Sequence, residues 1–208
     1  MSAMRQLGNG LSDGNHYTDA ASVKEAELSM LRRLGASEGD TLGVQGNLAN
    51  TYSLLSRHEE ALQMKRDVYS GWSRLNGEED EDTLRAVLNY ADSLISLKRF
   101  KEAKSVLRKS MPVARRVLGE DHDITLKMRL IYAKALYTDA GATHDNLRAA
   151  VLTLEETERT ARRVFGGPHP ITVEIESSLR ASRVVLSARE GDVEPLRAAV
   201  EAMAPGDA

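Results

Sequence analysis

Hydrophobic residues recur along most of this chain at spacings of three and four positions, the pattern of helices that bury one face. Leu48, Ala49, Tyr52 and Leu55 show it most clearly. Ala, Leu, Arg and Glu are abundant and aromatic residues make up only 4% of the chain. Such residues lose little conformational freedom in a helix, so the composition also favours helices over sheets. The sequence therefore predicts an all-α fold.

The helical pattern repeats with a period of 42 residues. The clearest markers are threonines that follow a glycine-containing linker, at positions 41, 83, 125 and 172. The last interval is 47 residues long, which we interpret as a 42-residue unit with an insertion around residues 139–144. Eight residues after the first three threonines stand Ala49, Ala91 and Ala133, small residues that would let a neighbouring helix approach closely.

Each repeat is predicted to contain two helices, because two segments with a buried face are separated by a break. Pairs are expected at about 40–75, 82–118, 123–165 and 170–203, preceded by a lone helix at 17–34. One pair cannot bury its apolar faces alone, so stacked pairs would form a single solenoid over residues 17–203. Residues 1–16 are expected to be an irregular or degenerate start, and residues 204–208 a disordered tail.

The predicted helix ends carry residues suited to them. Gly35, Gly77, Gly119 and Gly166 stand where a helix C-terminus favours a residue with positive φ. The predicted N-caps are Asp40, Asp82, Asp123 and the repeat threonines. His122 and His169, at one linker position in successive units, are expected to pack on the adjacent linker and help to cap a helix. Pro112 predicts a kink near residues 108–112, with a helix boundary there as the alternative.

The linkers Leu118–Leu126 and Phe165–Val173, together with Asn47-Leu-Ala and Asn89-Tyr-Ala, resemble the 42-residue tetratricopeptide repeats of kinesin light chain and related scaffolds. The resemblance implies a right-handed superhelical α-solenoid of antiparallel helix pairs. In that family the first helices line a concave groove that binds peptides, and an Asn before the conserved Leu often contacts the peptide backbone. Asn47 and Asn89 match that position, whereas the next two units have Ile131 and Ser178 there.

The polar residues expected on the concave face follow from helical geometry, if Leu48 and Tyr52 point into the core. They are Asn47, Asn50, Arg85, Asn89, Asp92, Lys127, Lys134 and Tyr137. Asn side chains could bond a peptide backbone, and the basic residues could meet acidic side chains. The alternative interpretation is an ordinary solvated helix face.

Composition and motifs narrow the classes of function. The net charge of −3 and the lack of a basic stripe argue against nucleic acid as a partner. The chain has no Cys, its five His do not form a metal motif, and it has neither a phosphate-binding loop nor a nucleophile elbow. Apolar runs fall far short of the roughly 20 residues that span a membrane.

The sequence therefore predicts a cytoplasmic protein-interaction module with a scaffold or adaptor role, whose partner is a protein or peptide. No enzymatic activity, cofactor, metal or small-molecule substrate is expected. The alternative is a regulatory, sensor or oligomerising segment of a larger signalling protein, since the repeat pattern begins part-way through a unit.

Overall fold

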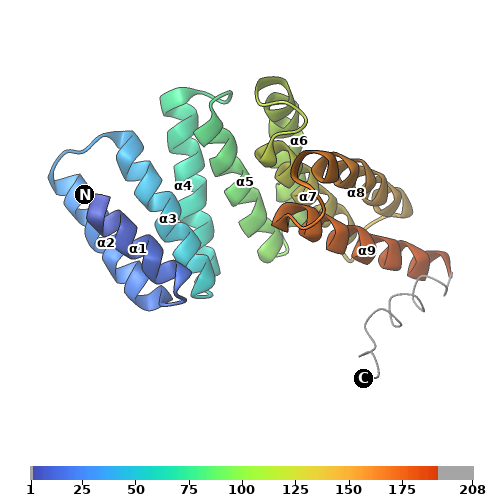
Figure 1. Ribbon diagram of the computed structural model, residues 1–208, viewed down its shortest axis with the longest axis horizontal. Coiled ribbons are helices and arrows are strands. Elements are labelled where there is room, and N and C mark those ends of the chain that lie inside the picture. The colour runs from blue at the N-terminus through green and yellow to red at the C-terminus, as the bar shows by residue number, and fades with distance from the viewer. Residues whose placement is uncertain (1, 192–208) are drawn as a thin grey trace. The chain divides into compact units, whose positions relative to one another are not determined.

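The computed structural model describes residues 2–191 of the 208-residue chain, and over this range it is helical without strands (Figure 1). The all-α prediction is confirmed. The helices are α1 (Ser2–Asp13), α2 (Tyr17–Arg33), α3 (Glu38–Leu54), α4 (His58–Asn76), α5 (Glu81–Ser96), α6 (Phe100–Val117), α7 (Asp123–Tyr137), α8 (His144–Phe165) and α9 (Pro170–Glu190). The predicted second helix of the last pair, up to residue 203, and the predicted tail at 204–208 lie outside the described residues.

The helices form two compact units, and a single solenoid over residues 17–203 stays a prediction. Unit 1 spans residues 1–99 and contains α1 to α5; unit 2 spans residues 100–208 and contains α6 to α9 in its described part. Within each unit, every helix packs against the next one in the chain, and α7 also contacts α9. Short loops join these neighbours, so consecutive helices of a unit run antiparallel (Figure 1).

The start of the chain differs from the prediction, because residues 2–13 form helix α1 instead of irregular structure. α1 packs against α2, so the helix predicted to stand alone at 17–34 has a partner. Gly8 lies at this close contact, because a Cβ at that position would be 3.1 Å from Cγ of Lys24. Gly8 is buried and stands 41 residues before Ala49, one residue short of the period, so it takes the corresponding small-residue place in α1.

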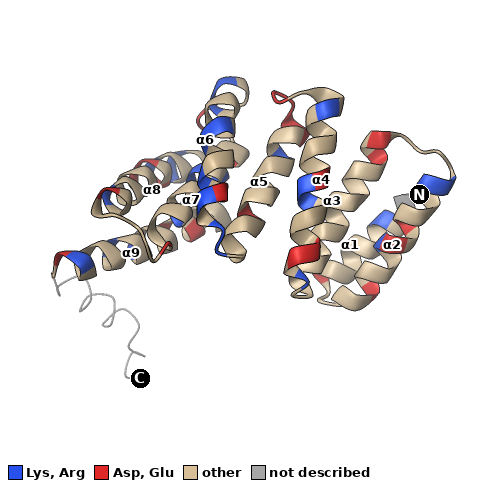
Figure 2. Ribbon diagram, turned by 180° about the vertical axis from the view of Figure 1, so that it is seen from behind, with Lys and Arg blue, Asp and Glu red and all other residues tan. Residues whose placement is uncertain are grey.

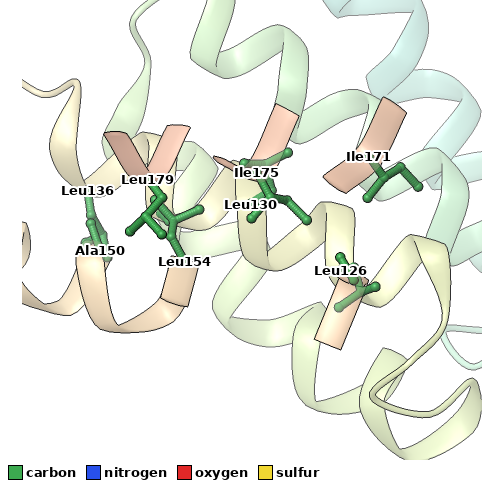
Figure 3. Close-up of a cluster of buried hydrophobic side chains, with 10 residues drawn as sticks. Leu126, Leu130, Leu136, Ala150, Leu154, Ile171, Ile175 and Leu179 are labelled. Atoms are coloured by element: carbon green, nitrogen blue, oxygen red, sulfur yellow. The ribbon is translucent and has the colours of Figure 1, made fainter. Parts of the chain in front are cut away.

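Each unit has its own buried apolar cluster. In unit 2, α7 contributes Leu126 and Leu130, α8 contributes Leu154, and α9 contributes Ile175 (Figure 3). Each of these residues is at most 2% exposed. The cluster of unit 1 consists of Ala21, Leu28, Leu31, Val44, Leu48, Tyr52 and Ala61. Burying a side chain the size of Leu contributes about 1.5–3 kcal/mol, so these clusters supply most of the drive to fold.

Glycines end the helices as predicted. The φ angles of Gly35, Gly77, Gly119 and Gly166 are 63°, 86°, 96° and 81°. Residues that have a Cβ atom rarely adopt this backbone conformation. The chain can therefore leave each helix and turn toward the next one without steric strain.

The N-caps differ in part from the prediction. His122 and His169 cap α7 and α9, each accepting a backbone N–H at 3.3 Å through Nδ1, which confirms their capping role. α3 and α5 are capped by Ser37 and Asp80. The prediction of Asp40, Asp82 and Asp123 as caps was wrong, because these helices begin one to three residues earlier and place them in the first turn.

The repeat threonines were also wrongly predicted as caps. Thr83, Thr125 and Thr172 lie in the first turn and are at most 1% exposed. Their hydroxyl oxygens have no hydrogen-bond partner in the part of the chain that the structure describes. At these three positions the fold buries the threonine methyl group, and the unpaired hydroxyl is a cost.

Pro112 does not end a helix. α6 continues from Phe100 to Val117 with Pro112 inside it, so the alternative of a boundary there is wrong. The kink near residues 108–112 stays a prediction.

Replacing Thr125 by Val tests the cost of the buried hydroxyl. The two side chains have nearly the same shape, and Thr125→Val removes an unpaired polar atom, so we expect the free energy of unfolding to rise by about 1 kcal/mol. Thr41→Val is the matched control, because Thr41 Oγ1 donates to the Ser37 carbonyl at 3.1 Å and the variant should lose stability. Chemical denaturation measures both, and a Thr125→Val protein less stable than wild type would contradict the interpretation.

Gly71 tests close approach between α3 and α4. A Cβ at Gly71 would lie 2.5 Å from Cδ2 of Leu42, which is itself buried. We expect Gly71→Ala to destabilise the protein by about 1–3 kcal/mol through overpacking, despite the better helix propensity of Ala. Gly43→Ala in α3 is the control, because nothing lies within 4 Å of its Cβ position, and it should be stabilising by up to about 1 kcal/mol. Thermal unfolding of the two variants should shift in opposite directions, and a common direction would refute the steric explanation.

Candidate functional site

The polar side of two first helices in unit 1 carries four of the predicted site residues. α3 holds Asn47 and Asn50, and α5 holds Arg85 and Asn89. Asn47 and Asn89 are half-buried, whereas Asn50 and Arg85 are exposed. Among residues 2–191, no protein group hydrogen-bonds the side-chain amides of the three asparagines. Arg85 pairs with Glu81 one turn earlier on its own helix.

Packing of the neighbouring residues decides where these asparagines lie. Leu48 and Ala49 are 1% and 0% exposed, so they fix which side of α3 faces the core. Asn47 precedes this pair, and Asn89 stands 42 residues later at the equivalent place before Ala91, which is also 0% exposed. The repeat therefore holds two unpaired amides at equivalent positions of successive first helices.

Asp92 has a different environment from the other predicted residues. It lines a small cavity of about 130 Å³ at the ends of α3, α4 and α5, together with Ser53, His58, Lys65, Ser93 and Ser96. Lys65 is only 6% exposed and donates to Oγ of Ser53 at 3.2 Å. Burial lowers the pKa of Lys65, and the nearby negative charge of Asp92 partly opposes this.

A second buried lysine occupies the equivalent position of the preceding pair. Lys24, 41 residues before Lys65, donates to Ser12 Oγ at 2.8 Å and to Thr51 Oγ1 at 2.9 Å. Burial lowers its pKa as well, against the charges of Asp13 and Glu27. In the later units this position holds Leu107 and Leu154, both fully buried. Sequence reasoning missed both lysines, although the repeat spacing places them in register with core leucines.

The three predicted residues of unit 2 are already engaged within the protein. Lys127 donates to Asp123 at 3.1 Å, and Lys134 on α7 donates to Glu174 on α9 at 2.7 Å. Tyr137 is half-buried and packs against the apolar cluster of unit 2. Burial tends to raise the pKa of Asp123, but Lys127 and His122 lower it overall. A ligand would have to displace these partners, so unit 2 offers less free binding capacity at the predicted positions.

Sequence reasoning also missed a basic pocket in unit 2. A cavity of about 630 Å³ is bordered by α6, α7 and α8, and five arginines line it. The signal was present in the spacing: Arg108 and Arg115 stand seven residues apart on α6, and Arg159 and Arg163 stand four apart on α8. Each spacing puts both residues on one helix face.

The described residues form neither a metal-binding cluster nor a membrane-spanning helix. Within residues 2–191, no three His, Asp or Glu side chains gather as a metal site would require. None of the described helices combines the length and the apolar character that crossing a bilayer requires.

Comparison with known proteins agrees with this geometry. Residues 40–115 match the tetratricopeptide repeat family. A crystal structure of Podosopora anserina kinesin light chain-type repeats, described as nearly identical TPR-like repeats, superposes with a TM-score of 0.76 at 17% identity, covering 94% of this chain and 91% of that one. BtubC (BKLC) from P. vanneervenii gives a TM-score of 0.73 at 15% identity, covering 99% and 82%. No curated protein matches the sequence.

These findings identify the fold. Residues 40–115 match the tetratricopeptide repeat family, and the chain shares the TPR-like helical repeat fold of these solved structures. The identities of 15–17% are too low to carry over any partner from those proteins.

Lys65→Leu tests whether the buried lysine costs stability. The pKa of Lys65 is lowered in the folded state, so below the unfolded value of about 10.4 the unfolded chain binds the proton more tightly and folding is penalised. Replacing Lys65 by the leucine of the later repeats should stabilise the protein at pH 7, by about 1 kcal/mol or more. Ser53 keeps a partner, because its Oγ also donates to the Ala49 carbonyl.

The advantage of Lys65→Leu should shrink as the pH rises toward 11, because the wild-type lysine is then neutral in both states. Denaturation at several pH values measures this trend. Lys109→Leu is the control, since Lys109 is exposed on α6 and its replacement should change stability little at any pH. A pH-independent effect of Lys65→Leu would show that its charge is not what costs stability.

Proposed function

We propose that this chain is a protein-interaction module in which the polar side of α3 and α5 binds an extended segment of a partner protein, in a scaffold or adaptor role. The observation that carries the proposal is the pair of unpaired amides at Asn47 and Asn89, one repeat apart. An asparagine side chain can donate and accept at once, as a peptide bond does, so it can bond the backbone of a ligand whatever the ligand's sequence.

The fold supports a binding role in general terms. Tetratricopeptide repeats generally mediate protein–protein interactions, and a repeat fold of this type is typically a non-enzymatic scaffold. Rigid helices also hold the asparagines in place before the ligand arrives, which lowers the entropy cost of binding.

Charge adds selectivity to the backbone contacts. The Arg85–Glu81 pair is exposed, and pairs of this kind contribute at most about 1 kcal/mol. Arg85 can therefore exchange Glu81 for an acidic side chain of the ligand at little cost. We infer that the preferred segment is extended and carries an acidic residue near the contact with α5.

Unit 1 is favoured over unit 2 as the binding surface. Lys127 and Lys134 are held by acidic residues of the protein, and Ile131 and Ser178 replace the asparagine in the last two units. The contacts proposed for the ligand thus concentrate on Asn47, Asn50, Arg85 and Asn89.

Selection of binders from a library of random dodecapeptides tests the proposal. Wild-type protein should enrich peptides that bind it as extended chains. The double variant Asn47→Ala plus Asn89→Ala should bind the selected peptides about tenfold more weakly or worse, since each lost bond leaves a peptide group unsatisfied. Methylating the peptide backbone nitrogens one at a time should reproduce the loss at particular positions.

Asn76→Ala is the matched control, because Asn76 is exposed at the end of α4 and does not lie on a first helix. It should leave peptide affinity unchanged. If no peptide is enriched, or if the double variant binds the selected peptides as tightly as wild type, the proposed surface is wrong.

A further inference from the structure

The arginine-lined pocket of unit 2 contains more positive than negative charge. Arg108, Arg115, Arg129, Arg159 and Arg163 line it, together with the acidic residues Glu120, Asp121 and Glu156. Figure 2 shows how basic positions gather on α6 and α7 in this unit. With five arginines against three carboxylates, the lining carries an excess of two positive charges.

Three of the arginines are accounted for by the three acidic residues. Arg115 donates through Nε to Glu120 at 2.6 Å, and Arg163 donates to Asp121 at 2.8 Å. Arg129 donates to Glu156 at 2.7 Å and lies 3.5 Å from Glu120. Only the Arg129 side chain, 15% exposed, is largely shielded from water, and through Glu120 and Glu156 it links α7 to the α6–α7 loop and to α8.

The other two arginines are not accounted for by the fold. Arg108 donates through Nε to the Tyr132 hydroxyl at 3.1 Å, an uncharged partner. Arg159 has no hydrogen-bond or ion-pair partner among the described residues. A guanidinium group has five N–H donors, so most donors of these two side chains are free to bind a ligand.

The rest of the lining limits the kind of anion that fits. Met111, Pro112 and the Tyr132 ring add apolar surface, and the volume of about 630 Å³ is in the range of sites for small ligands or a few residues of a peptide. The three carboxylates would repel a polyanion such as a nucleic acid. The pocket therefore suits one compact anion attached to a partly apolar carrier.

We propose that this pocket binds a phosphate monoester, presented by a partner protein as a phosphorylated serine or threonine. A phosphate monoester carries a charge of about −1.5 to −2 at neutral pH, which matches the excess charge of the lining. The planar guanidinium forks of Arg108 and Arg159 fit phosphate oxygens in pairs, and no lysine lines the pocket. The carboxylates at the edge can accept backbone N–H groups of the peptide that carries the phosphate.

This pocket is distinct from the surface proposed above. It lies in the other unit and includes none of the predicted concave-face residues. Its ligand is recognised by charge, whereas α3 and α5 would recognise a peptide backbone. The two proposals can therefore fail independently.

The test is an NMR titration of the full ¹⁵N-labelled chain with N-acetyl-O-phosphoserine N-methylamide at low ionic strength. Backbone amides of the pocket segments of α6, α7 and α8 should shift and saturate, and binding should weaken with added salt. The double variant Arg108→Gln plus Arg159→Gln should raise the Kd about tenfold or more, since charged hydrogen bonds are lost. Neither arginine takes part in an ion pair of the described protein, so the variant should stay folded.

Two further variants sharpen the test. Arg180→Gln on α9 is the matched control, because Arg180 is exposed outside the pocket and should not affect the Kd. Glu156→Gln removes a carboxylate from the lining and should tighten binding. A gain of affinity cannot come from unfolding, so this variant tests the charge argument even if another variant loses its structure.

Two ligand controls separate the sources of the anion. N-acetylglutamate N-methylamide should bind more weakly than the phosphoserine probe, and so should inorganic phosphate, which lacks the carrier. If inorganic phosphate bound as tightly as the phosphoserine probe, the inference that the phosphate is presented on a protein side chain would be wrong. No saturable binding of the phosphoserine probe, or equal affinity in wild type and in the double arginine variant, would overturn the pocket as an anion site.

Discussion

Close approach between neighbouring helices is the constraint on which the rest of this structure depends. Ala49, Ala91 and Ala133 are completely buried at equivalent positions of their repeats, and Gly8 takes the corresponding place in α1. Interiors this tightly packed tolerate little change of volume. Because these contacts fix the rotation of each helix about its axis, they also determine which polar side chains remain outside, including Asn47 and Asn89.

Local rules made much of the fold predictable. The 42-residue spacing and the glycines with positive φ depend on residues close in sequence, and the structure has them where expected. α1 was missed because its glycines are poor helix formers, and its stability comes from packing on α2, which no local pattern reveals. The N-caps were displaced by one to three residues, since several capping residues cluster in each linker and sequence alone does not rank them.

The site was harder to predict than the fold for the same reason. The equivalence of Asn47 and Asn89 follows from the repeat. The hydrogen bond from Lys134 to Glu174, in contrast, joins residues 40 positions apart, which no local pattern predicts. The basic pocket depends on three helices meeting, and its arginines are far apart in sequence. Net charge concealed it as well: the chain carries −3 overall, yet α6 has six basic residues and one acidic residue. A small total charge therefore says little about the field at one surface.

The buried lysines of unit 1 have a consequence for covalent chemistry. An acylating reagent or a modifying enzyme needs the free amine of a lysine in contact with solvent, and Lys24 and Lys65 are only 4% and 6% exposed. Burial lowers their pKa, and opening removes that effect together with the barrier to access, so access limits their reaction. The rate at which they are labelled then reports how often α2 and α4 come away from their neighbours. The labelling rates of these two buried lysines would thus measure the local opening of unit 1.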